Sequence, residues 1–281
     1  MRGAALILVL WLVALLSALV AVFALTARVE GLQGRVLGDR AAAAEIARAG
    51  VEYAVLRLLD PDLETRWWPD GSRYAWRFDG VPVEIRIVDE SGKVDLNLAD
   101  APMLSRLMQA LGETPEAAEA LASAIADWRD PDSLTQPAGG AEDADYAAAG
   151  LPYGAKDAPF EAISELRQVL GMSPQLYQKM APHLSVESGQ PQPNPTFAQA
   201  PVLTALGLDP APILAQRARF AAGLEPSPFM GRGSGTYSIE SRARPARGGE
   251  TTLQAVVRAS ARNVPGSVYT ALHWQEGASP P

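Results

Sequence analysis

The chain begins with an apolar run that no ordinary globular core accommodates. From Ala4 to Leu25 it carries no charged side chain. As an α-helix, these 22 residues would be about 33 Å long and would cross the ~30 Å hydrocarbon core of a bilayer. Three roles are open for such a run: a secretory signal that is removed, a plain membrane anchor, or a helix that works inside an assembly.

The length of the run argues against a removed secretory signal. The apolar region of a signal peptide is usually about 7–15 residues long. Ala24 to Arg28 also continue into a helical pattern, without a small-x-small cleavage site before a turn. The segment is therefore predicted to stay. Arg2 and the amino terminus favour a cytoplasmic location for this end, although Arg28 weakens that bias, and the rest of the chain is predicted to face outward.

Composition narrows the classes of function. The chain has 281 residues, 48% of them apolar, which is enough for one or two ordinary cores. A net charge of −8 argues against a nucleic acid as the main partner, because phosphate binding needs clustered Lys and Arg. The absence of cysteine excludes disulfides and thiolate metal sites. An exported domain of this kind must rely on packing, or on a hard metal such as calcium.

The helical pattern continues beyond the apolar run and is predicted to stop at Asp60-Pro61. Its second half is amphipathic, with one side formed by Val29, Leu32, Val36, Ile46, Ala49, Ala54 and Leu58. Glycines interrupt it at positions 31, 34, 38 and 50. Each costs roughly 1 kcal/mol relative to Ala in a helix, so we expect a bend or a melted turn near the membrane surface.

Two groups of strands are predicted, far apart in the sequence. The first is RYAWRF and VPVEIRIVDE, in which Val83, Ile85 and Ile87 alternate with charged residues as in a half-buried strand. The second is TYSIES, TTLQAVVRAS and SVYTALHW, which are separated by glycine and proline turns. This spacing is typical of an antiparallel meander.

The stretch between the two groups of strands, roughly residues 95–225, is predicted to be helical. Helix starts are indicated at Thr114-Pro115 and Ser173-Pro174, where a capping hydroxyl precedes a proline. A short internal repeat at an offset of 99 residues matches Ala101-Pro102 with Ala200-Pro201. The helical stretch is therefore interpreted as an insertion, in one or two parts, into an α+β domain.

A loop rich in carboxylates is the main candidate for chemistry. It contains Asp127, Asp130, Asp132, Glu142, Asp143 and Asp145, with only Arg129 to offset them. The carboxylates repel one another unless water solvates them or a cation bridges them, and Ca²⁺ accepts 6–8 oxygen ligands in flexible geometry. A solvated acidic loop, a calcium site and a carboxylate pair for glycoside hydrolysis are all open.

Other sites have weaker support. His183 and His273 lie in unrelated contexts, which argues against a zinc site, and no G-x-S-x-G nucleophile motif occurs. The segment FEAISELRQVLGMSPQLYQKMAPHL is similar to a helix-hairpin-helix DNA-binding unit, but Arg167 and Lys179 are its only cations near the turn. We therefore favour a helical hairpin with a structural role there.

Several motifs together resemble the GspK family, the minor pseudopilin K of the type II secretion system. They are the N-terminal RGAALILVLWLVALLSALV, then GKVDLNLADAPMLSRLM, IADWRDPD with GGAEDADY, and PFEAISELRQVLGMSPQLY. The second Ala-Pro-x-Leu sequence, which begins at Ala200, is the last of these motifs along the chain. The resemblance covers nearly the whole chain.

The resemblance gives the apolar run a role in assembly. In such proteins a prepilin peptidase cuts after the glycine, here Gly3, and methylates the new N-terminus, here Ala4. The leader is then only Met1-Arg2-Gly3, shorter and less basic than is usual. Leu8 stands at the fifth mature position, where most pilin-like chains carry Glu. GspK-like chains commonly lack this Glu, which fits a subunit at the tip of a filament.

The resemblance also implies an organisation and a function without catalysis. The expected parts are a leader (1–3), a transmembrane or assembly helix (4–25), a pilin-like helix with the first strands (26–94), an all-α insertion (95–225) and C-terminal strands completing the sheet (226–281). The helix would pack on an antiparallel sheet. The protein would stand in the inner membrane with its C-terminal domain in the periplasm, and calcium would bind the acidic loop.

The expected partners are the I-, J- and H-type minor pseudopilins, with which the chain would form the pseudopilus tip and start its assembly. We expect the interface to use the amphipathic half of the long helix and the adjoining edge of the sheet. Charged residues at Val51 and Val55 should then abolish association or, if these positions are buried on the sheet, unfold the domain. Two other functions are kept open: a membrane-anchored DNA-uptake protein built on helix-hairpin-helix units, and a membrane-tethered hydrolase that uses the acidic loop.

Overall fold

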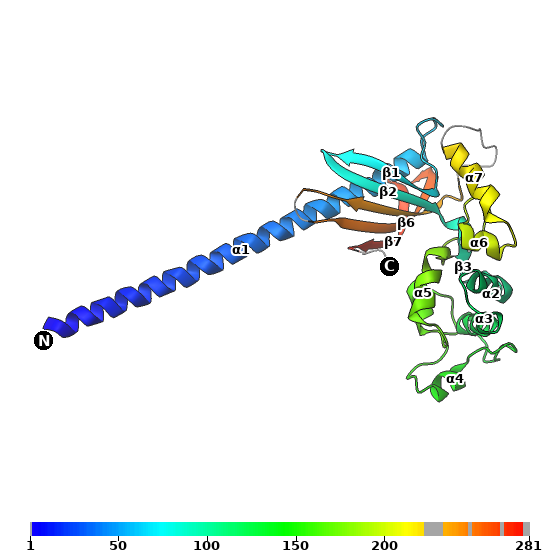
Figure 1. Cartoon of the computed structure of the whole chain (residues 1–281), viewed down its shortest axis with the longest axis horizontal. Helices are drawn as coiled ribbons and strands as arrows, with labels where there is room; N and C mark the ends of the chain where they lie inside the picture. Colours follow the sequence, from blue (N-terminus) through cyan, green and yellow to red (C-terminus); the bar gives the residue numbers. More distant parts are fainter. Residues whose placement is uncertain (1, 222–232, 247–248, 265–266, 278–281) are drawn as a thin grey trace.

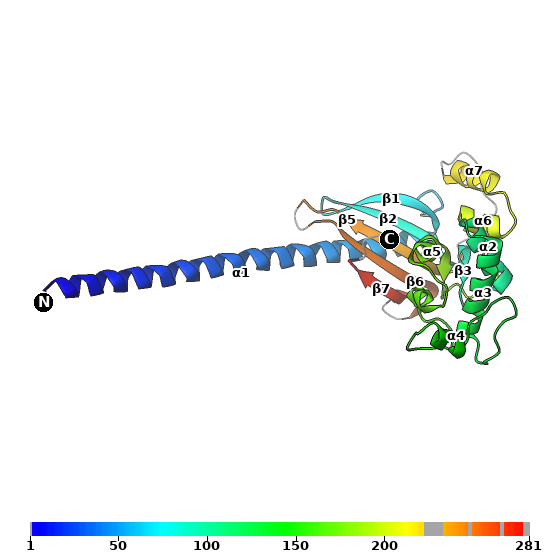
Figure 2. The same ribbon diagram turned by 60° about the horizontal axis from the view of Figure 1, so that its bottom comes forward.

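The computed structural model describes residues 2–221, 233–246, 249–264 and 267–277. A single long helix, α1, runs far beyond the rest of the molecule (Figure 1). A sheet packs against its C-terminal part, and a group of short helices lies at the end of the sheet that is farther from the N-terminus (Figures 1 and 2). The α-helices are α1 (Arg2–Leu58), α2 (Ala101–Ala110), α3 (Pro115–Arg129), α4 (Asp143–Ala148), α5 (Pro174–Met180), α6 (Ala200–Ala205) and α7 (Pro210–Ala221). The 3₁₀ turns are η1 (Glu90–Gly92), η2 (Ile163–Gln168) and η3 (Ala181–His183).

Five strands form one antiparallel sheet in the order β1-β2-β5-β6-β7. These are β1 (Asp70–Phe78), β2 (Val81–Asp89), β5 (Thr236–Ala243), β6 (Thr251–Val264) and β7 (Ser267–Glu276). All five predicted strands are therefore confirmed. The central pair is β2 with β5, in register from Val83 opposite Ala243 to Asp89 opposite Tyr237. The chain thus leaves the sheet at the end of β2, forms the helical region, and re-enters the sheet as β5, the neighbour of β2.

The C-terminal part of α1 and one face of the sheet share a core. The fully buried apolar positions of α1 are Ala43, Ala47, Val51, Ala54 and Val55, which recur about once per helical turn. They meet the alternate residues Val83, Ile85 and Ile87 of β2 and their neighbours on β5 and β6. The predicted arrangement of a long helix on an antiparallel sheet is confirmed. Val51 and Val55 lie inside this core. Of the two roles considered for them, burial on the sheet is confirmed and a partner surface is not.

The glycines of α1 do not break the helix, which runs unbroken from Arg2 to Leu58. At Gly31, Gly34 and Gly38 an added Cβ would meet no other atom within 4 Å. The bend expected there is absent, because the flanking Leu, Gln and Arg residues are good helix formers and offset the isolated glycines. Gly50 differs from these three: an added Cβ would lie 2.1 Å from Ser241 Oγ and 3.1 Å from Val83 Cγ1. Its small size lets α1 approach the sheet.

Gly50→Ala is therefore expected to destabilise the fold, although alanine is the better helix former. Overpacking of a close contact typically costs about 1–3 kcal/mol, which exceeds the propensity gain of ~1 kcal/mol. The buried Ser241 Oγ has no hydrogen-bond partner, so Ser241→Ala should recover part of the loss in the double variant. Denaturant unfolding of the two single variants and the double variant measures this coupling. If the changes in unfolding free energy of the two single variants simply add in the double variant, residues 50 and 241 are not in contact.

A second hydrophobic core lies in the helical region. Its largest fully buried side chains include Leu96, Leu104, Leu107, Met108, Ile125, Tyr146, Leu166, Met180, Leu184 and Leu203. The predicted helix starts are confirmed, because Thr114 Oγ1 accepts the N–H of Ala117 and Ser173 Oγ accepts that of Leu176. Both copies of the Ala-Pro repeat begin a helix, α2 and α6. The two helices contact one another, and Arg106 Nε donates to Ala205 O at 2.8 Å.

Two details of this region differ from the prediction. The segment before Gly171 forms the 3₁₀ turn η2 rather than the first helix of a hairpin. The region is also not purely helical, because β3 (Val94–Asp95) and β4 (Leu184–Ser185) pair in parallel where distant segments meet at its base. The expected domain boundary at residue 225 lies outside the described residues.

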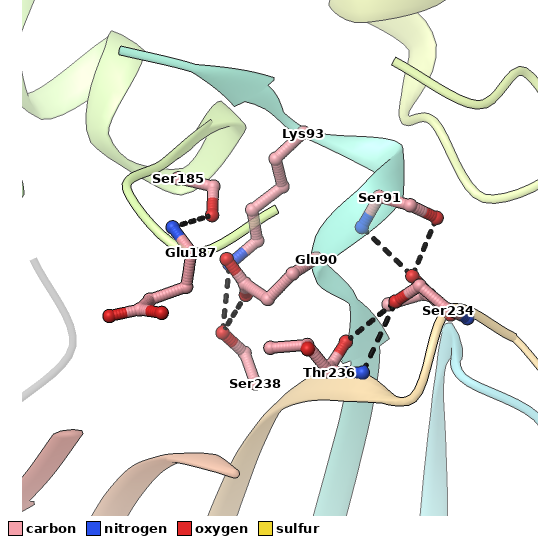
Figure 3. Close-up of polar contacts among 9 residues, drawn as sticks. Glu90, Ser91, Lys93, Ser185, Glu187, Ser234, Thr236 and Ser238 are labelled. Carbon is pink, nitrogen blue, oxygen red and sulfur yellow. Dashed lines mark hydrogen bonds and ion pairs between the residues drawn. The ribbon is translucent and has the colours of Figure 1, made fainter. Parts of the chain in front are cut away.

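Buried polar groups join the helical region to the sheet (Figure 3). Lys93 Nζ lies 2.5 Å from Glu90 Oε1 and donates to Ser238 Oγ at 2.8 Å. Asp89, which is fully buried, accepts hydrogen bonds from Ser91 and from Ser234 N, the latter at 2.7 Å. These contacts join the segment that follows β2 to β5 and to the segment that precedes β5. Hydrogen bonds and an ion pair therefore hold the helical region on the sheet, in addition to the two peptide connections.

Candidate functional site

The acidic loop runs from the last turn of α3 to the start of α4. Asp127 on α3 is fully buried, and both of its carboxylate oxygens accept the N–H of Gln136 at 3.2 Å. A Cβ at Gly140 would lie 1.9 Å from Asp127 Oδ2, so only glycine lets the loop close over this carboxylate. Burial raises the pKa of Asp127, and the negative charge of Asp130 raises it further.

Glu142 is the second buried acid of the loop. Its Oε1 and the Oδ1 of Asp130 are buried without a hydrogen-bond partner. Burial, followed by the charges of Asp127, Asp130, Asp157 and Asp132, raises the pKa of Glu142 from 4.5 to about 7. A buried carboxylate oxygen with no partner is costly. The loop thus holds two acceptor atoms that a cation or a proton would satisfy.

The other three predicted acids are exposed and accept hydrogen bonds from backbone N–H groups of the loop and of the segment after α4. Asp132 Oδ1 accepts the N–H of Leu134 at 2.8 Å, and Asp143 Oδ1 accepts that of Ala155 at 3.1 Å. Asp145 Oδ2 accepts the N–H of Glu142 at 3.0 Å, at the first turn of α4. These bonds fix the shape of the loop. They leave further lone pairs free on each carboxylate.

Arg129 does not neutralise the loop by ion pairing. Its guanidinium donates instead to the carbonyl oxygens of Leu96 and Ala99, the second at 2.6 Å. Within the described part of the chain it has no ion pair with a loop carboxylate. The single cation that the sequence offers against six acids is thus used to hold the base of the helical region.

Asp157 is an acid of the site that the sequence analysis missed. It follows the loop by 12 residues, has a left-handed backbone with φ of 54°, and donates its N–H to Trp128 O at 3.1 Å. Its charge contributes to the raised pKa of Glu142. The sequence gives no signal for it, because Asp157 follows Lys156 in a segment without any acidic pattern.

The fit of a metal to this loop rests on these oxygens. Within the described ranges, no group of three or more Asp, Glu, His or Cys side chains lies close enough to hold an ion as it stands. The available donors are nevertheless all oxygens, and two of them are buried without partners. That donor set suits a hard cation such as Ca²⁺ and not zinc. His183 and His273, on η3 and β7, lie in different parts of the fold.

The proposed processing site lies at the start of α1. Gly3 and Ala4 belong to the first turn of the helix as described, and cleavage between them stays a prediction. Residues Val9 to Leu25 expose their apolar side chains, with Trp11 and Phe23 about three quarters exposed. Of the helices in the described residues, only α1 is long and apolar enough to cross a membrane.

The segment compared with DNA-binding hairpins uses both of its cations internally. The Arg167 guanidinium lies 4.3 Å from the ring centroid of Tyr177, and Lys179 Nζ donates to Leu111 O at 3.3 Å. With η2 in place of a first helix, the segment lacks the paired helices of a helix-hairpin-helix unit. The geometry therefore gives no support to DNA binding.

Comparison with known proteins identifies the region that contains the acidic loop. Residues 86–189 match the family of type II secretion system (T2SS) protein K. This part of the chain is therefore similar to protein K of the type II secretion system. The type II secretion system protein K of Pectobacterium carotovorum subsp. carotovorum is 38% identical over 84 residues, which are 30% of this chain and 25% of that protein. The protein K of Klebsiella pneumoniae is 38% identical over 97 residues, 34% of this chain and 28% of that protein.

A solved structure extends the similarity of fold beyond the matched region. It is the crystal structure of the GspK-GspI-GspJ complex from the type 2 secretion system of enterotoxigenic Escherichia coli. The similar chain covers 90% of this chain and 99% of its own length, with a TM-score of 0.61 and 20% identity. The sequence matches to the curated relatives span only about a quarter of their length. Protein K is a structural family without enzymatic activity, as the sequence analysis expected.

Proposed function

We propose that this chain is a minor pseudopilin of a type II secretion system. It assembles with minor pseudopilins of the I-, J- and H-types at the tip of a periplasmic pseudopilus, and it helps to start the assembly of that filament. The observation that supports the proposal is the match of residues 86–189 to protein K, in a chain whose α1 exposes apolar side chains along its N-terminal half. The similar solved chain is part of a complex with GspI and GspJ, which supports the choice of partners.

The N-terminal part of α1 is proposed to anchor the chain in the inner membrane before assembly. The apolar run from Ala4 to Leu25 is long enough to cross the bilayer core, and its side chains from Val9 onward are exposed. The sheet and the helical region would then lie in the periplasm. In the assembled pseudopilus the same apolar surface would pack against the helices of neighbouring subunits.

The tip position rests on Leu8. A carboxylate at the fifth mature position would need a neighbouring subunit's terminal amine as its partner, and an unpaired charge in lipid is costly. With Leu8 at this position, the chain has no such requirement. A subunit with no neighbour ahead of it fits this pattern, which supports placement at the end of the filament.

The acidic loop is proposed to bind calcium. Asp127, Asp130, Asp132 and Glu142 would supply the ligands, because their charges already act on one another, with Asp157 beside them. Asp143 and Asp145 would hold the loop and complete the ligand set where their free lone pairs allow. Calcium would satisfy the two buried unpaired oxygens and would fasten α4 to the end of α3.

Cleavage by a prepilin peptidase tests the proposal at the N-terminus. When the full chain is expressed with the peptidase of its own organism, intact mass analysis should show loss of Met1 to Gly3 and a methylated Ala4. Gly3→Leu should keep the leader, whereas Gly31→Leu, in the same helix, should not affect processing. A functional wild-type chain that retains residues 1–3 would contradict this assignment.

The division of α1 makes a further prediction about solubility. A shortened chain that begins at Ala41 keeps every buried position of α1, the first of which is Ala43, and removes the bare apolar part. It should be soluble and should unfold cooperatively on heating. Circular dichroism that shows a folded chain with no melting transition, or persistent aggregation, would contradict the division.

A further inference from the structure

The two edge strands of the sheet differ in how they resist pairing with another chain. The outer edge of a sheet offers unpaired backbone N–H and C=O groups, and proteins usually block it with charges, prolines or bulges. In the described residues the edges are β1 and β7. The expected interface includes an edge of the sheet, so the question is which edge is open.

The β1 edge carries the usual protection. Arg73 and Arg77 are exposed along it, and Arg73 forms an ion pair with Glu84 at 2.8 Å. The register with β2 shifts between Asp70 and Arg73, which marks an irregularity at one end of the strand. At the other end the chain turns at Asp79 with a left-handed backbone, φ 46°. A strand added here would face two cations and an irregular end.

The β7 edge lacks the charges of β1, although its pairing with β6 is also irregular, because the register shifts between Val256 opposite His273 and Val257 opposite Ala271. The ten residues Ser267–Glu276 contain no proline, glycine, Lys or Arg, and the first acid is Glu276 at the very end. Val268 is 51% exposed, and Thr270, Ala271 and His273 are also exposed. Val, Tyr, Thr and Trp favour extended backbone. At about 3.3 Å per residue the strand is roughly 33 Å long, and its uncharged edge is a template for a further strand.

The β7 edge is continuous with the exposed side of α1. Tyr269 and Trp274 turn toward the helix and pack against its core. The guanidinium of Arg48 lies 5.8 Å from the ring centroid of Trp274 and pairs with Glu52, and both of these charged side chains are 55% exposed. The exposed Arg48 and Glu52 of α1 therefore lie beside β7.

We propose that β7 is the docking edge for an extended strand of a neighbouring pilin-like subunit, one whose own apolar N-terminal helix runs parallel to α1. This inference rests on the proposed function. The added strand would be held by main-chain hydrogen bonds, and its side chains beside Val268 and Thr270 would be uncharged, because the edge offers no cation to pair with an acid.

A second copy of this chain cannot pair its own β7 with this edge and keep the two α1 helices parallel. Two copies that pair their β7 strands in antiparallel fashion are related by a two-fold axis perpendicular to the sheet. That axis would reverse the direction of one α1 relative to the other, so the two apolar half-helices would point to opposite sides. They could not both enter one membrane or one filament core. A different pilin-like subunit with a parallel helix meets no such conflict.

The test uses the full chain with the I- and J-type pseudopilins of its own organism, extracted together in detergent. Amide hydrogen exchange is compared for the chain alone and in the complex. We expect at least about tenfold slower exchange in residues 267–276 on complex formation, and little change in β1. Val268→Lys with Thr270→Lys, at exposed positions, should weaken association about tenfold or more. Ala75→Lys, at an exposed position of β1, is the matched control and should leave association unchanged.

Each alternative outcome rejects the inference in a recognisable way. A complex that forms with slower exchange in α1 alone, and tolerates the lysines in β7, leaves the proposed function standing and rejects β7 as the docking edge. Slow exchange of β7 in the isolated monomer means that the chain's own segments cover the edge. Slow exchange of β7 that depends on the concentration of the chain alone identifies a second copy as the occupant. Failure of any complex to form rejects the proposed function together with this inference.

Discussion

Replacing Val55 with aspartate is expected to unfold the sheet and the C-terminal part of α1. Val55 is fully inaccessible in the core between helix and sheet, where it packs in a cluster of apolar side chains. A buried, unpaired carboxylate and the loss of apolar contacts cost roughly 4 kcal/mol or more. That is comparable with the whole stability of an ordinary domain, about 5–15 kcal/mol. Circular dichroism melting of the shortened chain from Ala41 measures the effect.

Leu56→Asp is the matched control, at the next position of the same helix. Leu56 is 63% exposed, so aspartate there should change the melting midpoint little. In the full chain it should weaken association with partner pseudopilins, because it places a charge on the open face of α1. An unfolded Leu56→Asp variant, or a Val55→Asp variant with wild-type melting, would contradict the packing of α1 described here.

Removing calcium is expected to lower the melting midpoint by several degrees. A ligand that binds only the folded state stabilises it by about 2.7 kcal/mol at a hundredfold excess over its Kd, which corresponds to roughly 5–10 °C for a domain of this size. Chelation should lower the midpoint, and Ca²⁺ should restore it better than Mg²⁺, whose octahedral demand suits this loop poorly. Scanning calorimetry of the full chain, with and without chelator, makes the measurement.

Two substitutions assign that shift to the acidic loop. Asp130→Asn and Glu142→Gln remove the charge beside each buried unpaired oxygen and keep the side-chain shape, so each should abolish most of the calcium shift. Glu119→Gln, at an exposed position of the same helix α3, should retain it. If chelator, Ca²⁺ and both loop variants leave the midpoint alike, the loop is a solvated acidic turn and the calcium proposal is wrong.

The calcium-free protein should also depend on pH in a direction set by Glu142. Its pKa is about 7 in the folded chain and near the ordinary 4.5 in the unfolded chain. Between these values the folded state binds more protons than the unfolded state, so stability falls as pH rises from about 4.5 to about 7. Glu142→Gln should flatten this part of the profile. A stability that rises across the same range, with the Glu142 contribution isolated by the variant, would contradict the burial of this carboxylate.

Local sequence patterns predicted the elements of the fold well. The alternation of Val83, Ile85 and Ile87 placed β2 and its buried face, and the hydroxyl-proline pairs at Thr114 and Ser173 placed the starts of α3 and α5. These features act through bonds and faces within a few residues, so they can be recognised without knowing the tertiary structure. The length of the apolar run likewise predicted the bare half of α1.

Features that depend on distant segments escaped the sequence analysis. The amphipathic pattern of α1 could not say whether Val51 and Val55 face a partner or the chain's own sheet, because both environments are apolar. Gly50 looked like the other glycines of the helix, although Ser241 lies against it. Asp157 joins the acidic site only through folding, and Arg129, which seemed to offset the loop, bonds to Leu96 and Ala99 instead.

The most direct test of the account is association of the full chain with the I- and J-type pseudopilins of its own organism. The three proteins would be expressed together with their prepilin peptidase, extracted in detergent and analysed by size exclusion with light scattering. The account predicts a complex with one copy of this chain, which Leu56→Asp weakens and which the matched surface variant Ala75→Lys leaves intact. If all three proteins are processed and folded but elute with only the molar masses of the separate proteins, the assignment of this chain as a minor pseudopilin is contradicted.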